Sequence, residues 1–534
     1  MTALDAPRPA TAPGRRSPPL VTIAVLALVA GWELSARTLG AAFVIVGPVE
    51  VATYLSQNAG LMMRALSATA QSAAWGFVIG NLAALLLAAT AILVPRSETL
   101  VSALALLVFC LPLVATGPIL RVLFGPGTGP QITLAGLAVY YTTFVPLMVG
   151  VRAAPATWFD LVRTYGGGRL SALVHVRARA ALPYFFAGLQ IAAPAAFLGA
   201  MVGEFTGAER GLGVLTIRAM RALDVDAIWA IATLSAAAAI LAYLAIGWLA
   251  EAVTRAPPPV ILTPPRSAPP TGTSGRIAGA VLRWSVVAVT VLAAWWGLMT
   301  AFDLSPFFAK RPGDVFGALF LDTDAAGTRQ TLTTALGETL VFVLPGYLAG
   351  LAAGAGLAIA VSLNRLAALV TMPLAITLRS VPIVTTAPLV IVLLGRGAAG
   401  TIALVALMVF FPTLVACLYG LKQAPGQILD VMRSYGAGRG RQLLHARVPA
   451  MLPAFFAAAR MAVPASILAT TVVEWLATGR GIGSLMALSA SLSDYDMLWS
   501  CVVVVALLTV LLHGLVARLE RAVAARFASE QLAR

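Results

Sequence analysis

The sequence has few charged residues, and acidic residues are especially scarce. Charged side chains make up 11% of the 534 residues, hydrophobic side chains make up 60%, and the mean hydropathy is +0.92. Because soluble domains carry about 25% charged residues, this composition excludes a soluble globular protein. Lys and Arg total 36 against 21 Asp and Glu, which gives a net charge of +15. The basic residues flank apolar runs, where they determine topology, so no nucleic-acid partner is expected.

Cysteine is also scarce, and a phosphate-binding loop is missing from the sequence. Cys110, Cys417 and Cys501 lie inside apolar runs without metal-ligand spacing, so we expect packing roles for them, and neither a metal nor a cofactor. The sequence has no Gly-x-x-x-x-Gly-Lys-[Ser/Thr] run, whose backbone donors and lysine would hold the phosphates of a nucleotide. The chain is therefore not expected to be an enzyme, and any ATP hydrolysis should occur in a separate subunit.

Long apolar runs occupy most of the chain. They begin near Leu20, Ala73, Thr99, Ile132, Ala180 and Ala227, and again near Trp284, Leu340, Leu366, Thr401, Ala450 and Leu498. A helix needs about 20 apolar residues to cross a bilayer, and unbroken runs of this length exclude barrel strands. We therefore predict an all-α polytopic membrane protein of about twelve transmembrane helices. They form two six-helix repeats, which are parallel because each repeat has an even number of spans.

The apolar runs fall into two halves joined by a linker. Residues 256–276 are rich in Pro, Ser and Thr and lack periodicity, which is typical of a semi-rigid spacer. The predicted divisions are an N-terminal tail at 1–19, a first half at 20–255, this linker, a second half at 277–517 and a C-terminal tail at 518–534. The basic loops and the C-terminal tail fall on one side, so the positive-inside rule predicts that both termini and the linker are cytoplasmic.

One basic loop between apolar runs occurs twice, at residues 160–183 and 430–453. The second copy follows the first at a constant offset of 270 residues (435 minus 165). The offset pairs Asp160, Arg163, Tyr165 and Gly166 with Asp430, Arg433, Tyr435 and Gly436. The aspartate should favour the first turn of a helix, and the glycine lets the chain turn away after it. The two copies predict two equivalent docking points; the alternative is a pair of solvated connectors whose arginines only fix topology.

Further motifs repeat at the same offset. The proline motifs are Leu111-Pro112 and Gly117-Pro118, echoed by Val381-Pro382 and Ala387-Pro388. The acidic motifs are Glu204 with Gly211-Leu212-Gly213, echoed by Glu474 with Gly481-Ile482-Gly483. Together with the loop, these motifs resemble the inner-membrane permeases of ATP-binding cassette importers, in their nitrate/sulfonate/taurine-like branch. The first loop departs from the family pattern, because Arg179 stands where Pro449 fills the proline position of the second loop.

This resemblance implies two permease halves fused in tandem, each with one EAA-type loop that couples to an ATPase subunit. It also implies two copies of the ATPase, an external substrate-binding protein and membrane lipid as partners, in the cell inner (plasma) membrane. The implied solute is a small anion such as sulfonate, taurine or nitrate, and the alternative is a pyrimidine-type vitamin precursor. Judged from the residues alone, an ion-coupled secondary transporter with parallel repeats and a non-transporting scaffold also fit.

Two acidic residues are candidates for the solute pathway. Glu204 and Glu474 stand at the external end of the fifth apolar run of each half. An acid in this place is either exposed at the membrane interface or acts in gating or packing. In the second case we expect Arg210 and Arg480, or backbone donors, to compensate the charge.

A third pathway candidate is Arg379, which interrupts the third apolar run of the second half just before a proline. Its first-half equivalent is Phe109, so the two halves differ at a point where they should face each other. A charge inside a span usually faces a bundle interior or a water-filled cavity. Arg379 either snorkels to the cytoplasmic interface or lines the pathway and offers donors to an anionic solute.

Overall fold

The computed structural model describes residues 18–39, 45–125, 127–254, 274–364, 371, 375, 383–395 and 397–527. These residues form helices joined by turns, and no strand occurs among them. The helices of the first half are α1 (Pro18–Leu39), α2 (Pro48–Gln57), α3 (Ala59–Leu93), α4 (Glu98–Phe109), α5 (Leu113–Phe124), α6 (Gly129–Arg152), α7 (Ala156–Thr164), α8 (Arg169–Ala172), α9 (Ala178–Glu204), α10 (Leu212–Ala222) and α11 (Val225–Thr254). Those of the second half are α12 (Ser274–Ala301), α13 (Pro312–Phe320), α14 (Ala325–Ser362), α16 (Ile383–Leu394), α17 (Ala398–Lys422), α18 (Gly426–Ser434), α19 (Arg439–Gln442), α20 (Val448–Val473), α21 (Gly481–Ser491) and α22 (Tyr495–Phe527).

Nine helical segments of the described chain are long and apolar enough to cross a membrane. They are Ala59–Leu93, Gly129–Arg152, Leu170–Glu204, Val225–Thr254, Trp284–Ala301, Ala325–Ser362, Ala398–Lys422, Arg439–Leu476 and Tyr495–Val523. The prediction of an all-α polytopic membrane protein is confirmed. Most of the predicted linker lies outside the described residues, and the last helix continues past the predicted boundary at 517 to Phe527.

The apolar run that begins near Thr99 forms two short helices instead of one span. Helices α4 and α5 have 12 residues each and are separated at Leu111-Pro112. At about 1.5 Å per residue, each is shorter than the roughly 30 Å hydrocarbon core. Pro112 lacks an N–H group, and the residue before a proline is biased away from helical geometry, so the chain breaks there. In the second half, most of the equivalent run lies outside the described residues, and α16 begins at Ile383.

Close helix contacts hold each half together. Helix α6 packs against α3 and α9, and α17 packs against α14 and α20. A Cβ atom on Gly80 would lie 2.6 Å from the carbonyl oxygen of Gly136, and one on Gly350 would lie 2.5 Å from that of Ala406. Small residues at these points therefore let the helix backbones approach. Gly356 of α14 differs, because a Cβ there would meet no atom within 4 Å.

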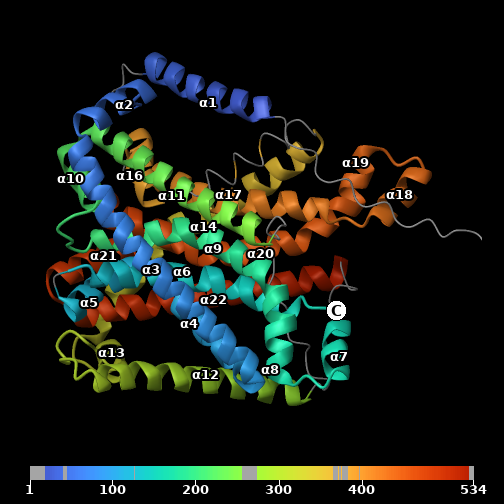
Figure 1. Ribbon diagram of the computed structural model, residues 1–534. Helices are drawn as coiled ribbons and strands as arrows, with labels where there is room; N and C mark the ends of the chain where they lie inside the picture. The colour runs from blue at the N-terminus through green and yellow to red at the C-terminus, as the bar shows by residue number, and fades with distance from the viewer. Residues whose placement is uncertain are drawn as a thin grey trace, which may run out of the picture.

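The two halves share one core, and their repeated loops lie at the same end of the molecule. Met201 and Leu212 of the first half belong to a buried cluster with Leu404 and Val472 of the second. Figure 1 shows α7, α8, α18 and α19 at one end of the bundle, which we call the loop end. Helices α2, α10, α13 and α21 lie at the opposite end, which we call the turn end. This arrangement matches the parallel repeats predicted from the sequence.

Candidate functional site

The two repeated loops have the same backbone geometry. Helices α7 and α18 have nine residues each, and a proline precedes each of them. Gly166 and Gly436 follow the helices with φ values of 72° in both copies, in the left-handed region that glycine tolerates best. The N–H of Gly166 donates to the carbonyl of Arg163, and the N–H of Gly436 donates to that of Arg433, each at 2.9 Å. The structure therefore assembles the predicted loop residues twice in one geometry.

The loop aspartates do not occupy the first turn of either helix. Asp160 and Asp430 come too late in α7 and α18 to meet the positive end of the helix dipole. Each faces the arginine three residues further on, with Arg163 at 3.7 Å in the first copy and Arg433 at 2.9 Å in the second. The prediction that the aspartate favours the first turn of the helix is wrong, and each aspartate instead lies beside an exposed arginine.

Large apolar side chains are exposed beside these charges. Tyr165 is 84% exposed and Tyr435 is 87% exposed. Leu161 on α7 and Val431 on α18 are also exposed. Exposed apolar side chains gathered at one point on a protein mark interaction sites. We call these two regions, residues 156–166 and 426–436, the coupling surfaces.

The coupling surfaces differ in what supports them. In the first half, the Arg177 guanidinium lies 5.4 Å from the ring centre of Phe159. The second half has Leu429 at the position of Phe159. A π-helical turn nevertheless leads into the next long helix in both copies, although only the second copy has the family's proline. Arg179 therefore leaves the backbone path of the first loop unchanged.

At the turn end, Glu204 ties three elements together. Its side chain is only 2% exposed, at the end of α9. One carboxylate oxygen accepts a hydrogen bond from the Thr69 hydroxyl of α3 at 2.6 Å, and the other accepts from the N–H of Gly213 at 2.6 Å. The Thr69 hydroxyl oxygen in turn accepts from the N–H of Leu212 at 2.8 Å. The start of α10 is thereby bonded to α3 and α9.

The second half repeats this arrangement with one change. Glu474, 1% exposed, uses a single oxygen to accept from Thr339 at 3.1 Å and from the N–H of Gly483 at 2.8 Å. An additional acid, Glu338, accepts from the N–H of Gly481 at 2.8 Å. We call each set of bonds the turn-end clasp.

In both clasps the glutamate carboxylate is buried and accepts hydrogen bonds from a threonine and from the backbone. Exposure at the membrane interface is wrong for both, because both carboxylates are buried. Within the described chain, their donors are a threonine and backbone N–H groups, while Arg210 and Arg480 contribute no contact to either carboxylate. Backbone donors can hold a buried carboxylate as an arginine would. The structure thus gives the glutamates a packing role.

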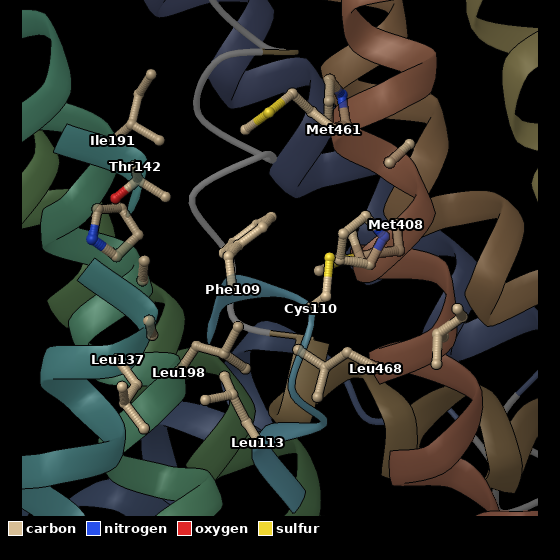
Figure 2. Close-up of a pocket in the computed structure, with 18 of the residues that line it drawn as sticks. Phe109, Cys110, Leu113, Leu137, Thr142, Ile191, Leu198, Met408, Met461 and Leu468 are labelled. Atoms are coloured by element: carbon tan, nitrogen blue, oxygen red, sulfur yellow. The ribbon is translucent and has the colours of Figure 1, made fainter. Parts of the chain in front are cut away.

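A cavity of about 410 Å³ lies between the halves. The α4–α5 break forms part of its wall with Phe109 and Cys110, and Met408 of α17 and Met461 of α20 face them (Figure 2). Its polar lining consists of hydroxyl groups, from Thr142, Tyr243, Thr386 and Thr509. No charged side chain lines it among the described residues. The described lining of the cavity is therefore largely apolar.

Arg379 lies outside the described residues, so the structure does not place it. Its first-half equivalent is informative, because Phe109 lines the cavity. Phe109 also stacks on Tyr141, with ring centres 4.3 Å apart. The position that diverges between the halves thus belongs, in the first half, to the cavity wall.

A charged cluster inside the second half was not predicted from the sequence. The Arg460 guanidinium of α20 lies 3.1 Å from the carboxylate of Glu520 on α22, and both side chains are largely buried. His513 of α22 contacts the Arg460 carbonyl at 3.3 Å. The first-half equivalents are uncharged: Gln190, Ala250 and Tyr243. Arg460 interrupts an apolar run just as Arg379 does, so the same criterion could have found it.

Comparison with known proteins identifies the repeated unit. The model of the family described as "binding-protein-dependent transport system inner membrane component" matches residues 76–257 and 346–525. A "Probable ABC transporter permease protein" of Haemophilus influenzae is 30% identical over 233 residues, which cover 43% of this chain and 94% of the relative. The formylaminopyrimidine transport permease protein ThiX of Halalkalibacterium halodurans is 26% identical, over 42% of this chain and 90% of the relative.

A sulfonate-type relative is also similar. The "Putative aliphatic sulfonates transport permease protein SsuC" of Escherichia coli is 26% identical over 140 residues, which cover 26% of this chain and 50% of the relative. The Haemophilus and Halalkalibacterium relatives each align along nearly their whole length with less than half of this chain. The chain belongs to the family of inner-membrane permease components of binding-protein-dependent ABC transporters, and it carries the family's domain twice in tandem.

Proposed function

We propose that this chain alone forms the complete membrane pathway of an ABC importer. The observation that carries the proposal is the pair of coupling surfaces, which share one geometry and lie at the same end of the bundle (Figure 1). One ATPase subunit docks on each surface, so the loop end is cytoplasmic and both termini are cytoplasmic. An external binding protein delivers the solute at the turn end. The excess of basic residues in the loops supports this orientation.

Affinity purification of the full chain from membranes tests this assignment. We expect two ATPase subunits per chain to purify with it, and the reconstituted complex to transport solute only with ATP. The competing class is an ion-coupled secondary transporter with parallel repeats. Transport by the purified chain alone, driven by a proton gradient, would overturn the proposal in favour of that class.

For the solute, we propose an uncharged, ring-containing molecule of the pyrimidine type. The cavity offers hydroxyl groups, thioethers and aromatic rings, and its volume falls in the range of small-molecule sites. An anion in such a site would lack a compensating charge, and desolvating it would be costly. The formylaminopyrimidine permease among the relatives has a name that fits this chemistry.

A small anion such as sulfonate, taurine or nitrate is the second candidate. It is supported by the sulfonate-type relative and by Arg379, which would be the anion's partner if it reaches the cavity. Uptake by the reconstituted importer with its own binding protein distinguishes the two, with labelled formylaminopyrimidine and taurine as probes. Uptake of taurine and not of the pyrimidine would overturn the uncharged-solute proposal while leaving the importer assignment intact.

A further inference from the structure

A second hollow, of about 560 Å³, lies at the loop end of the second half, beside α18 and α19. It is lined by the ends of α14 and α17, by residues of α18 and α19, and by the π-helical turn Leu443–Arg447. Its charged lining is entirely cationic among the described residues, with Lys422, Arg433, Arg439 and Arg447. We call this site the cationic hollow. It is separate from the cavity between the halves.

The hollow lies at the ends of two helices that are long and apolar enough to cross a membrane. Ser362 and Lys422 are the last residues of α14 and α17, both of which are membrane-spanning in length and hydropathy. Leu418 and Leu421 form part of the apolar wall. A ligand there would have its polar group among the cations and any apolar part against the leucines.

The first half shows what makes this hollow distinctive. The four cations have first-half counterparts at the same offset, which are Arg152, Arg163, Arg169 and Arg177. In that half, the carboxylate of Glu98 pairs with Arg152, and the Phe159 ring covers Arg177. The second half has Ala368 and Leu429 at the positions of Glu98 and Phe159. The same cations thus stand together without the acid that neutralises one of them in the first half.

Two contacts in the second half bear on the charge of the cationic hollow. Lys422 lies 5.7 Å from the ring centre of Tyr419, a contact that does not neutralise it. Arg433 pairs with Asp430 at 2.9 Å, and Asp430 does not itself line the hollow. Arginine guanidinium groups bind phosphate oxygens in a bidentate manner, and lysine binds them as a point charge. Basic pockets between membrane helices on the cytoplasmic side bind lipid head groups.

We propose that the cationic hollow binds a phosphate group at the membrane surface. Lys422 and Arg447 supply the cations nearest the helix ends, and Arg433 and Arg439 close the site from the loop. The phosphate belongs either to the head group of an anionic phospholipid or to free phosphate. Because Arg433 also belongs to a coupling surface, occupancy of the hollow orders the second coupling surface and leaves the first unaffected.

Binding to the purified full-length chain in detergent tests the proposal. The probes are dioctanoyl-phosphatidylglycerol, dioctanoylglycerol with the same acyl chains and no phosphate, and inorganic phosphate. The test variant combines Lys422→Gln with Arg447→Gln, neither of which lies in a coupling surface. The matched control combines Arg518→Gln with Arg521→Gln, two exposed arginines at the loop end of α22. Binding is measured as a dissociation constant and as a shift of the melting temperature.

We expect the phosphatidylglycerol probe to bind the wild type and the control variant equally. Its affinity for the test variant should fall roughly thirtyfold, since each basic residue near the surface contributes about fivefold. A fall of this size for inorganic phosphate instead identifies free phosphate as the source. A variant that combines Lys422→Arg with Arg447→Lys keeps both charges and should bind as the wild type does, which separates loss of charge from misfolding. Equal affinity in the test variant, or an equal fall in the control, overturns the proposal.

Discussion

Helices α7 and α18 have the same length, the same glycine turn and the same Asp–Arg pairing, although one belongs to each half. In the middle of the bundle, by contrast, the halves have diverged. Three residues of the first half correspond, at the same offset, to Arg460, His513 and Glu520 of the second. They are Gln190, Tyr243 and Ala250 in that order. In the proposed importer, each of these helices meets an equivalent ATPase subunit, which would keep the two copies alike. A single pathway between the halves would not need two equal walls, so the middle would be free to diverge.

The coupling glycines should give the largest effect. Replacing both Gly166 and Gly436 by Glu forces a side chain into the left-handed region, which costs roughly 1–2 kcal/mol at each site, and adds a charge to each coupling surface. We expect solute-stimulated ATP hydrolysis by the reconstituted importer to be lost, while the chain remains folded in the membrane. Of the single variants, Gly436→Glu should be the more severe, because the second loop keeps the family's proline.

Neighbouring glycines provide the control for that experiment. Gly168→Ala with Gly438→Ala alters the same loops at positions where a Cβ meets no atom within 4 Å and φ is not positive. This variant should hydrolyse ATP as the wild type does. Normal transport by the double Glu variant would contradict the assignment of the coupling surfaces.

The buried ion pair should give the next largest effect. Arg460→Gln leaves the carboxylate of Glu520 buried without its cation, and loss of one partner of such a pair costs about 3–5 kcal/mol. Combining Arg460→Gln with Glu520→Ala converts both positions to their first-half equivalents and should restore most of the free energy of unfolding. The measurement is denaturant-induced unfolding in detergent. Additive losses in the double variant would show that the two side chains do not act as a pair.

The turn-end clasp offers a smaller, matched comparison. In Glu204 both oxygens accept hydrogen bonds, so the amide group of Glu204→Gln must face a donor, at a cost of about 1–3 kcal/mol. In Glu474 one oxygen accepts both bonds, so Glu474→Gln can place its amide on the other side. We expect the first variant to lower the melting temperature more than the second. The reverse order would contradict this account of the clasp.

Arg379 should give the smallest effect if the solute is uncharged. Arg379→Phe introduces the residue that the first half already has in its cavity wall. Uptake of a pyrimidine-type solute should change by less than about twofold, since an uncharged solute makes no ion pair. Loss of uptake in the Phe and Gln variants, with partial retention in Arg379→Lys and an intact ATPase complex, would instead support the anionic solute.

The repeat and most of the membrane helices could be predicted from the sequence, because hydropathy and the constant offset depend on local residues alone. The sequence shows the α4–α5 break as Leu111-Pro112, but the length of the apolar run that begins near Thr99 led to the prediction of a single span. The loop residues take one geometry in both copies, as the constant offset indicates, and their coupling role stays a prediction. The position of Asp160 in its helix was predicted wrongly. Helix α7 begins directly after Pro155, so Asp160 comes after the first turn.

Contacts between distant residues could not be predicted. The burial of Glu204 depends on Thr69, which comes from a helix far earlier in the chain. The pairing of Arg460 with Glu520 likewise depends on how α20 packs against α22. No local pattern carries the register between two packed helices. Which described side chains line the cavity depends in the same way on which face of each helix turns inward.

The turn-end clasps have a mechanical consequence. In the first half, hydrogen bonds join α3, the end of α9 and the start of α10. In the second half, they join α14, the turn that follows α20 and the start of α21. We expect each set to move as one rigid unit. The helices of such a unit cannot separate without breaking buried hydrogen bonds to a carboxylate. We therefore expect movement at this end to occur between the halves, where α5 contacts α21 and α10 contacts α16. Opening at this end should therefore be a rigid-body movement of one half relative to the other. Distances between two spin labels within one clasped unit should stay constant during transport, while distances between labels on opposite halves should change.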